Sequence, residues 1–339
     1  MGIVNRRERV GDLAKAAIRL WGRSSPRRFL FFLKNALRLW QAERKRAHSQ
    51  RSIEGSVPMV IAVSPTMKCN YNCIGCYSRG RPTHRELETN ELDALFTEAE
   101  EIGVLAVVVT GGEPLLQNGL LNLMKDHRRL LFVLITNGSL FTQQTAINIA
   151  RSGNVVTLVS IEGLTEHTDL RRGNGAHENA LQAFRLLQQA HACYGFATTV
   201  TSLNAPHIVS GDFIEDMISL GCSVGYLVEY IPCGETLKPE WIMDKAAHTS
   251  FRNRILEMRN RKPIVLIHFP DDEYGPDNLC SAAGRLSLHI NSQGDVEPCP
   301  FVSISCDNIF CAGRSMLVLF TSIVNRLKSW QLSAGIIER

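Results

Sequence analysis

The sequence lacks any long apolar run of the kind that crosses a membrane. None of its uncharged apolar stretches reaches eighteen residues. The first residues, MGIVNRRERVGDLAK, also lack the apolar core and cleavage site of a secretory signal peptide. The ten cysteines are therefore not expected to form the disulfide framework of a secreted protein. We expect a cytoplasmic protein whose thiols bind metal.

The composition gives no indication of disorder, because 45% of the 339 residues are hydrophobic and 21% are charged. This length suits either one large α/β domain with extensions or two domains. The net charge of +4 is unevenly distributed. Residues 1–50 carry a net charge of +10 and the remainder a net charge of −6. The positive charge is thus a property of the N-terminal segment and bears on what that segment contacts.

This N-terminal segment predicts two helices over residues 8–48, broken near residues 24–26, with large apolar side chains between Arg and Lys. The pattern is typical of helices that lie on an anionic membrane surface. The alternative is that the apolar stripe docks on the protein's own barrel and the basic face is solvated. No nucleic-acid-binding motif accompanies the charge, so we expect no nucleic acid partner. Peripheral contact through residues 8–48 would extend the predicted location to the inner face of the membrane.

From residue 58 onward, short apolar runs alternate with amphipathic segments, which is typical of repeated βα units and a parallel sheet. Six strands and five intervening helices are too few for a closed eight-fold barrel. We therefore predict an α/β fold of the partial (β/α)6 TIM type, open on one side. The expected strands are 60–65, 105–110, 131–136, 155–161, 195–201 and 224–231. The expected helices are 90–102, 116–128, 142–151, 177–192 and 210–220.

These elements suggest three regions. Residues 1–52 form a basic helical extension, residues 53–235 the partial barrel, and residues 236–339 a linker helix with a small α+β extension.

The most informative motif is a C-x3-C-x2-C array, Cys69, Cys73 and Cys76, directly after the first predicted strand. Three cysteines this close converge on one metal centre when the backbone between them forms a loop. A 4Fe-4S cluster held by three thiolates keeps one iron open to a small molecule. A partial zinc site is one alternative, although the loop has no fourth Cys or His. Buried free thiols are the other.

Other unusual segments follow the next three predicted strands. They are Thr110-Gly-Gly-Glu-Pro114, Thr136-Asn-Gly138 and Ser160-Ile-Glu-Gly163. In parallel βα folds the chemistry lies at the carboxyl ends of the strands, where the connecting loops gather. The cysteine loop and these three segments are therefore expected at the same edge.

The cysteine array followed by Gly111-Gly112-Glu113-Pro114 resembles the radical S-adenosylmethionine (SAM) superfamily over roughly residues 58–235. The segment from Cys280 to Phe301 resembles the start of the C-terminal extension called SPASM or, when shorter, twitch. The resemblance implies a cluster on Cys69, Cys73 and Cys76 whose fourth iron binds SAM. One electron then cleaves SAM to methionine and a 5′-deoxyadenosyl radical, which abstracts hydrogen from the substrate.

The resemblance also implies roles for further residues. The two glycines would let the backbone approach SAM, Glu113 would accept from its ammonium group, and Pro114 would fix the turn. Arg172, within Asp169-Leu-Arg-Arg172-Gly173, would meet the methionine carboxylate. Gly75 departs from the pattern, because many relatives carry an aromatic residue there against adenine. The remaining candidates for SAM contact are Tyr77, Asn137, Ser160 and Glu162, and ordinary loop hydrogen bonding is the alternative for them.

Two C-terminal groups complete the predicted site. Cys280 and Cys299 fit the opening of the extension, and with Cys306 and Cys311 they would hold a second iron-sulfur cluster, although a final cysteine is missing. The loop residues Asp272, Glu273 and Tyr274 are weak candidates for a catalytic base, against the alternative of solvated loop side chains. The thiols of Cys193, Cys222 and Cys233 and the histidines His268 and His289 are expected to be core residues.

The sequence thus predicts a radical SAM oxidoreductase that takes electrons from a donor such as flavodoxin or ferredoxin. Its substrate is a peptide or protein, a tetrapyrrole or a lipid-like molecule. The alternative from another class is a non-catalytic iron-sulfur redox sensor or metal-binding module. The Gly111 to Pro114 segment argues against a sensor, which has no need of an amino-acid ligand beside the cluster.

Overall fold

The computed structural model describes residues 26–52, 57–274, 280, 284, 286–305 and 307–310. Among these residues, no helix is both long enough and apolar enough to cross a membrane. The chain divides into two compact units, which we describe separately. The first unit contains Cys69–Arg81, Val133–Cys280 and the helical residues before Ala36. The second contains Ala36–Lys68, Pro82–Phe132 and the described residues after Cys280.

The first unit is built on four neighbouring parallel strands in the order β4-β5-β6-β7. They are β4 (Val155–Ser160), β5 (Cys193–Val200), β6 (Val224–Glu229) and β7 (Val265–Phe269). Every residue of β4 is buried, as expected for a parallel strand that is covered on both faces. Because the strands run in one direction, their carboxyl ends share one edge, and the loops that follow them gather there.

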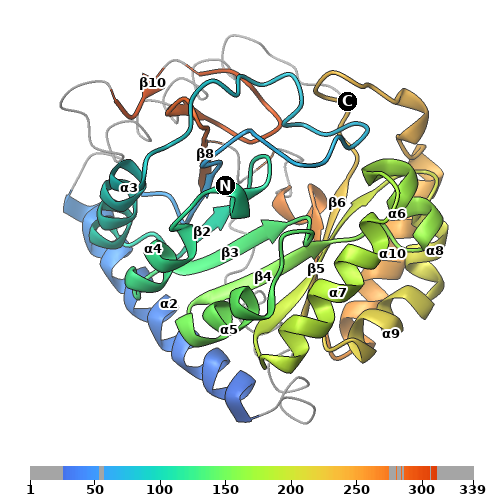
Figure 1. Cartoon of the computed structure of the whole chain (residues 1–339), viewed down its shortest axis with the longest axis horizontal. Coiled ribbons are helices and arrows are strands. Elements are labelled where there is room, and N and C mark those ends of the chain that lie inside the picture. Colours follow the sequence, from blue (N-terminus) through green and yellow to red (C-terminus); the bar gives the residue numbers. More distant parts are fainter. Residues whose placement is uncertain are drawn as a thin grey trace. The chain divides into compact units, whose positions relative to one another are not determined.

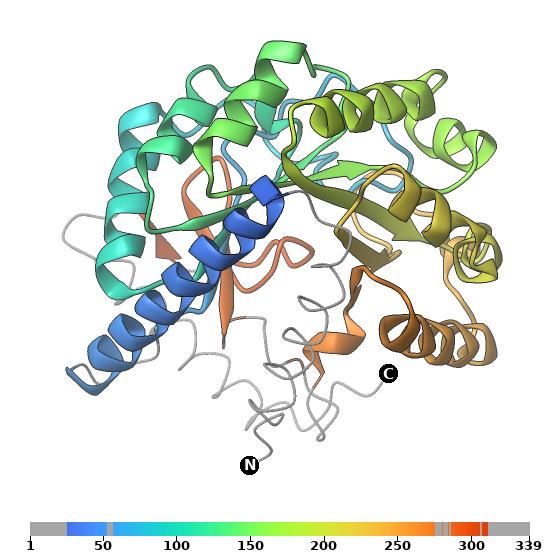
Figure 2. The same cartoon turned by 90° about the horizontal axis from the view of Figure 1, so that it is seen from below.

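Helices cover one face of these strands, with α7 against β4 and β5 and α10 against β7 (Figures 1 and 2). Polar side chains cap some of them: Thr142 accepts from the Thr145 amide ahead of α5, and Asp244 accepts from the Ala247 amide ahead of α10. The helices of this unit are α5 (Gln143–Ser152), α6 (Thr165–Arg172), α7 (Ala176–Gln189), α8 (Ala205–Ser210), α9 (Asp212–Ser219) and α10 (Lys245–Arg261), with the short 3-10 turns η2 (Pro239–Trp241) and η3 (Asp271–Glu273).

The second unit has the strand order β10-β9-β8-β1-β2. Strand β1 pairs in parallel with both β2 and β8, whereas β8, β9 and β10 pair antiparallel. The strands are β1 (Val60–Val63), β2 (Ala106–Val109), β8 (Ser287–Ile290), β9 (Asp295–Glu297) and β10 (Asp307–Asn308). Its helical segments are α3 (Thr89–Ile102), η1 (Pro114–Leu116) and α4 (Leu120–Asp126).

Two elements contain residues of both units, namely β3 (Leu131–Thr136) and α2 (Pro26–Ser52). Within the first unit, Arg28 of α2 donates to the carbonyls of Ala192 and Gly221. Within the second, the buried Arg46 pairs with Glu43, and the backbone of α2 closely approaches Gly103. The second predicted N-terminal helix is thus confirmed as α2, whereas the first lies outside the described residues.

All six predicted strands are confirmed within two residues at each end. The prediction for residues 116–128 is less accurate, because Gly119, with φ of +81°, separates η1 from α4. A second interruption lies at the start of the helix predicted for residues 210–220, because Gly211, with φ of +105°, separates α8 from α9. Strand β7 and helix α6 were not predicted. Because β7 continues the parallel pairing beyond residue 235, the predicted domain boundary there remains a prediction.

Candidate functional site

The three predicted cluster ligands lie in one irregular loop of the first unit. Cys69 is exposed, Cys73 is buried and Cys76 is half-buried. Among the described residues, their sulfur atoms do not form a group within 4.8 Å of one another. Thiolates on one zinc ion lie within that distance of one another, because each Zn–S bond is only about 2.3 Å long. In a 4Fe-4S cluster each thiolate binds a different iron, so a cluster does not require the sulfur atoms to lie that close.

The loop is fixed to its surroundings by backbone and side-chain hydrogen bonds. The Gly75 amide donates to Thr236 Oγ1 at 2.8 Å, and the Ile74 amide donates to the Arg171 carbonyl at 2.8 Å. Asn179 Nδ2 donates to the Tyr71 hydroxyl at 2.8 Å. These contacts hold the loop around Cys73 and Cys76 against elements that follow β4 and β6.

Gly75 is the departure from the family pattern, and the structure gives a physical reason for it. Its φ of +64° is left-handed, and a Cβ atom there would lie 2.5 Å from the ring of Tyr230. Tyr230 is 6% exposed and packs edge-on against Trp241 at 5.6 Å between ring centroids. An aromatic side chain at position 75 is thus excluded, and Tyr230 provides an aromatic ring at the same place.

Polar groups surround the candidate cluster thiols. The Tyr71 amide donates to Cys69 Sγ at 3.4 Å, and Asn137 Nδ2 approaches the same sulfur at 3.9 Å. Asn137 also donates to Asn70 Oδ1 at 2.8 Å, and Cys76 Sγ lies 3.1 Å from Ser78 Oγ. Hydrogen bonds to the ligand sulfurs are a usual feature of iron-sulfur sites. The residues therefore fit an iron-sulfur cluster, and Asn137 contacts the cysteine loop, whereas its predicted contact with SAM stays a prediction.

In the second unit, the Gly-Gly-Glu-Pro segment packs on the residues that lead into the cysteine loop. The Gly112 amide donates to the Thr66 carbonyl and the Glu113 amide donates to the Lys68 carbonyl, both at 2.9 Å. A Cβ at Gly111 would collide with the Thr66 carbonyl, and one at Gly112 with the Lys68 carbonyl. The glycines thus allow a close approach of two backbone segments.

Glu113 and Pro114 complete this turn. Glu113 is fully buried, and its Oε1 accepts from the Leu115 amide at 3.1 Å, which caps the short turn η1 beginning at Pro114. The predicted contacts of these four residues with SAM stay predictions.

Glu162 and Arg172, which were both predicted to contact SAM, form an ion pair with each other. Glu162 Oε1 accepts from Arg172 Nε and from Arg171 Nη1, each at 2.8 Å, and it forms an ion pair with Arg172 Nη2 at 2.7 Å. Its other oxygen accepts from the Thr199 amide at 2.7 Å. Burial opposes the charge of Arg172, but Glu162, Cys73 and Cys76 hold the pKa of Arg172 above its ordinary value. Much of the Arg172 guanidinium is therefore already engaged by the protein itself.

The sequence did not indicate Arg171 or Thr199 as site residues. Arg171 stands beside Arg172 in the same motif, so the doubled arginine was the signal available for it. Asp169, from the same motif, accepts from the amides of Gly175 and His177 at 2.9 Å and caps the start of α7. Ser160 is buried as the last residue of β4, and Tyr77 is half-buried directly after Cys76.

The weak catalytic candidates lie in and beside η3. Asp272 pairs with Arg252 at 2.8 Å and with Arg259, and it accepts from the His268 amide at 2.8 Å. Although burial opposes ionisation, the Arg259 hydrogen bond and charge hold the pKa of Asp272 below its usual range. A carboxylate so fully paired is a poor base. Glu273 ends η3, and Tyr274 forms an antiparallel bridge with Cys280.

The other predicted ligands and core residues divide as follows. Cys280 and Cys299 are half-buried and belong to different units, and Cys306 and Cys311 lie outside the described residues. His289 is a satisfied buried histidine, as predicted, bonded to Ser64 and Glu297 at 2.7 Å each. Cys193 and Cys222 are buried, which confirms them as core residues.

Comparison with known proteins relates this chain to one enzyme superfamily. The radical SAM superfamily pattern matches residues 63–210. The AdoMet-dependent heme synthase of Oleidesulfovibrio alaskensis is 26% identical, over 76% of this chain and 74% of that protein. The sporulation killing factor maturation protein SkfB of Bacillus subtilis is 22% identical, over 77% of this chain and 65% of SkfB.

Among solved structures, SuiB of Streptococcus suis bound to S-adenosylmethionine superposes with a TM-score of 0.70 at 18% identity, covering 86% of this chain and 72% of SuiB. This likeness confirms the predicted α/β partial-barrel fold. The family pattern spans the cysteine loop and the strands that follow it, so residues 63–210 form a radical SAM domain, and the chain is similar to radical SAM enzymes.

Proposed function

We propose that Cys69, Cys73 and Cys76 bind the 4Fe-4S cluster of this enzyme and that SAM binds at its open iron. The observation that carries the proposal is the loop itself, in which the three thiols of the C-x3-C-x2-C array share one irregular segment and N–H donors face Cys69. When bound, the cluster supplies the electron that splits SAM into methionine and a 5′-deoxyadenosyl radical. The substrate then loses a hydrogen atom.

The protein's own residues position and shield these groups. Asn137 and the Tyr71 amide orient Cys69, and the Gly111-Gly112 turn fixes the residues just before it. The pair of Glu162 and Arg172 places a buried positive charge near Cys73 and Cys76, where thiolate charge accumulates. Tyr230 takes the place of the missing aromatic side chain at Gly75 and would shield the adenine.

The test is anaerobic reconstitution with iron and sulfide, followed by dithionite, SAM and an assay for 5′-deoxyadenosine. Wild type should form the nucleoside, and Cys69→Ala should lose both the iron and the product. Cys233→Ala is the matched control, because Cys233 is a half-buried thiol of the same unit outside the array. Unchanged iron content and product in Cys69→Ala would contradict the assignment of the cluster ligands.

For the substrate, a tetrapyrrole is the first class to test, supported by the heme synthase relatives. A peptide is the second, supported by SkfB and by the structure of SuiB bound to its precursor peptide SuiA. Iron porphyrins with carboxylate side chains and a peptide mixture would each be added to the reconstituted enzyme. The true class should raise 5′-deoxyadenosine formation above the substrate-free rate and should itself change in mass.

A second iron-sulfur cluster on Cys280, Cys299, Cys306 and Cys311 is proposed on the resemblance of the C-terminal segment. Iron and sulfide analysis of Cys280→Ala with Cys299→Ala should show about four fewer irons per chain than wild type. Equal iron content would contradict it.

Flavodoxin or ferredoxin is the proposed electron donor, and reduced flavodoxin should replace dithionite in the assay.

Membrane contact through α2 is supported by an apolar face on that helix. Leu30, Leu33, Leu37 and Trp40 are 47–56% exposed and recur every three or four residues, the spacing of one helix face. Arg44 lies 4.8 Å above the Trp40 ring. Flotation with vesicles of anionic and neutral lipid tests the proposal. The variant Leu33→Ser with Leu37→Ser and Trp40→Ser should lose binding to anionic vesicles, and equal binding by both proteins would contradict it.

A further inference from the structure

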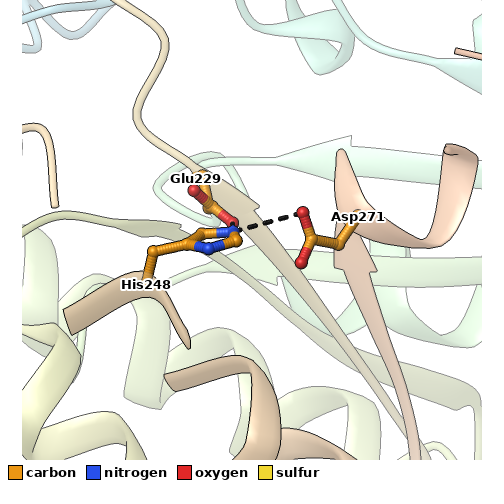
Figure 3. A group of neighbouring side chains, drawn as sticks. All are labelled: Glu229, His248 and Asp271. Atoms are coloured by element: carbon orange, nitrogen blue, oxygen red, sulfur yellow. Dashed lines mark hydrogen bonds and ion pairs between the residues drawn. The ribbon is translucent and has the colours of Figure 1, made fainter. Parts of the chain in front are cut away.

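A second group of metal-ligating side chains lies in the first unit, apart from the cysteine loop in sequence. Glu229 is the last residue of β6, Asp271 lies in η3 just after β7, and His248 stands in the first turn of α10 (Figure 3). The carboxyl ends of the two strands and the start of α10 thus bring three side chains together. None of the three takes part in the cluster and SAM site proposed above.

The distances within this group suit one small cation. His248 Nε2 lies 3.0 Å from Glu229 Oε1 and 3.2 Å from Asp271 Oδ1, and one ligand atom from each residue lies within 4.8 Å of the others. Tetrahedral ligands about 2.0–2.1 Å from a zinc ion are separated by roughly 3.3 Å. The observed separations are close to the edges of such a tetrahedron.

The neighbouring charges leave this group short of positive charge. Arg252 and Arg259 both pair with Asp272, at 2.8 Å for Arg252, so that carboxylate takes up much of their charge. Arg252 Nε lies farther from Asp271, at 3.6 Å from its Oδ2. With neutral histidines, these charged side chains sum to −1, because three carboxylates face two arginines. They are Glu229, Asp271 and Asp272 against Arg252 and Arg259. A cation, or a proton on histidine, is required to balance it.

A fully buried histidine points into the group without a hydrogen bond at its tip. His268 is 0% exposed, and its Nε2 lies 2.8 Å from Glu229 Oε1 but outside hydrogen-bond geometry, so that neither atom is satisfied. On the other side of the ring, Arg252 Nη1 lies 3.3 Å from Nδ1. A guanidinium only donates, so Nδ1 accepts and Nε2 carries the proton. Glu229 Oε1 accepts no hydrogen bond from this ring, so an unsatisfied oxygen remains for a cation to bind.

We propose that Glu229, His248 and Asp271 bind a divalent cation of the zinc class. One nitrogen and two carboxylate oxygens form a ligand set suited to Zn²⁺ and similar transition metals, whereas Mg²⁺ and Ca²⁺ prefer oxygen alone. Three protein ligands leave a fourth tetrahedral position open to water or to an oxygen atom of a substrate. Because it uses no residue of the cysteine loop, the site does not depend on SAM binding.

The experiment uses full-length, anaerobically reconstituted protein and Zn²⁺ buffered by a competing chelator. Wild type should bind one zinc more per chain than the near-isosteric variants Glu229→Gln and Asp271→Asn, and His248→Gln should weaken that binding at least tenfold. His84→Gln and Asp216→Asn are matched controls, because both side chains are exposed and lie outside the group. They should bind zinc as wild type does. Circular dichroism establishes that each variant is folded.

X-ray absorption at the zinc edge identifies the ligands of this additional ion. A shell of nitrogen and oxygen alone, present in wild type and lost in Glu229→Gln, supports the site. Equal zinc in wild type and all three variants, or a zinc shell containing sulfur, overturns it. Loss of stability in His248→Gln without any zinc dependence in wild type also overturns it, because His248 is then a protonated bridge between two carboxylates.

Discussion

Two glutamates of the first unit follow parallel strands at the same kind of position and have opposite surroundings. Glu162 follows β4, has a side chain 1% exposed and accepts from Arg171, Arg172 and the Thr199 amide. Glu229 ends β6, has a side chain 18% exposed and is approached by two imidazole nitrogens, yet its Oε1 accepts no hydrogen bond.

The difference shows that the carboxyl edge of the strands uses carboxylates in two ways. Glu162 is neutralised within the protein, so its contribution is to fix two arginines beside the cysteine loop. Glu229 is left with an unmet need for positive charge, which marks it as a ligand. Burial alone does not separate these roles, because the number of donors that each oxygen faces decides between them.

The largest expected effect is on stability when Glu162 is removed. Glu162→Ala leaves Arg171 and Arg172 buried without their counter-charge, so we expect the free energy of unfolding to fall by about 3–5 kcal/mol. Chemical denaturation of the anaerobically purified protein measures this. Glu162→Gln, which keeps the shape, should lose less. A change below about 1 kcal/mol in Glu162→Ala would erase the contrast between the two glutamates.

Glu229 should give the reverse result. Without added metal, Glu229→Gln should change the free energy of unfolding by less than about 1 kcal/mol, because the oxygen it alters accepts no hydrogen bond. With free Zn²⁺ at 100 times its dissociation constant, wild type should gain about 2.7 kcal/mol and Glu229→Gln should not. Denaturation curves with and without Zn²⁺ give both values. An equal gain in both proteins would place the zinc elsewhere.

A smaller effect is expected when the fork of Arg172 is replaced. Arg172→Lys keeps the positive charge but cannot reproduce both the Nε hydrogen bond and the Nη2 ion-pair contact with Glu162, so we expect a loss of about 1.5–3 kcal/mol. Arg171→Lys is the matched control, because Arg171 makes one bond to Glu162 through Nη1. Its loss should be the smaller one in denaturation experiments. The reverse order would mean that Arg171 is the main partner of Glu162.

Much of the fold and the cluster loop could be predicted from local patterns. Apolar runs such as residues 155–161 predict strands because a parallel strand is covered on both faces, and the cysteine spacing predicts a metal centre by itself. Tyr230 could not be predicted, because its contact with Gly75 joins residues 155 positions apart and depends on one positive φ. The Glu229, His248 and Asp271 group was missed for the same reason, since three separate elements contribute to it.

Predictions from local sequence patterns were also wrong where the conformation of one residue interrupts a helix. Residues 116–128 have helical periodicity, but a glycine with positive φ at position 119 delays α4. Asp272 was a candidate base on its position in the chain, whereas its two arginine partners come from α10 and give it a structural role. Charge balance of this kind depends on tertiary contacts that the sequence does not reveal.

The smallest expected effect concerns the thiols. Like the two glutamates, they differ in surroundings, because one thiol faces a hydrogen-bond donor and others are only buried. Burial raises the pKa of the Cys193 thiol to about 12 and also raises that of Cys222, despite the nearby charge of Arg28. At pH 8, a thiol with a pKa of about 12 is a thiolate only about 10⁻⁴ of the time, and the thiolate is the form that alkylates.

Cys69 is exposed and faces the Tyr71 amide. In iron-free protein, iodoacetamide should therefore modify Cys69 first and Cys193 far more slowly, as peptide mass spectrometry over time will show. Raising the pH from 8 to 9 should increase the slow rate at Cys193 about tenfold, because its pKa lies above both values. Equal rates at Cys69 and Cys193 at pH 8 would mean that β5 opens readily, and the buried setting assigned to Glu162, beside the Thr199 amide of that strand, would then fail as well.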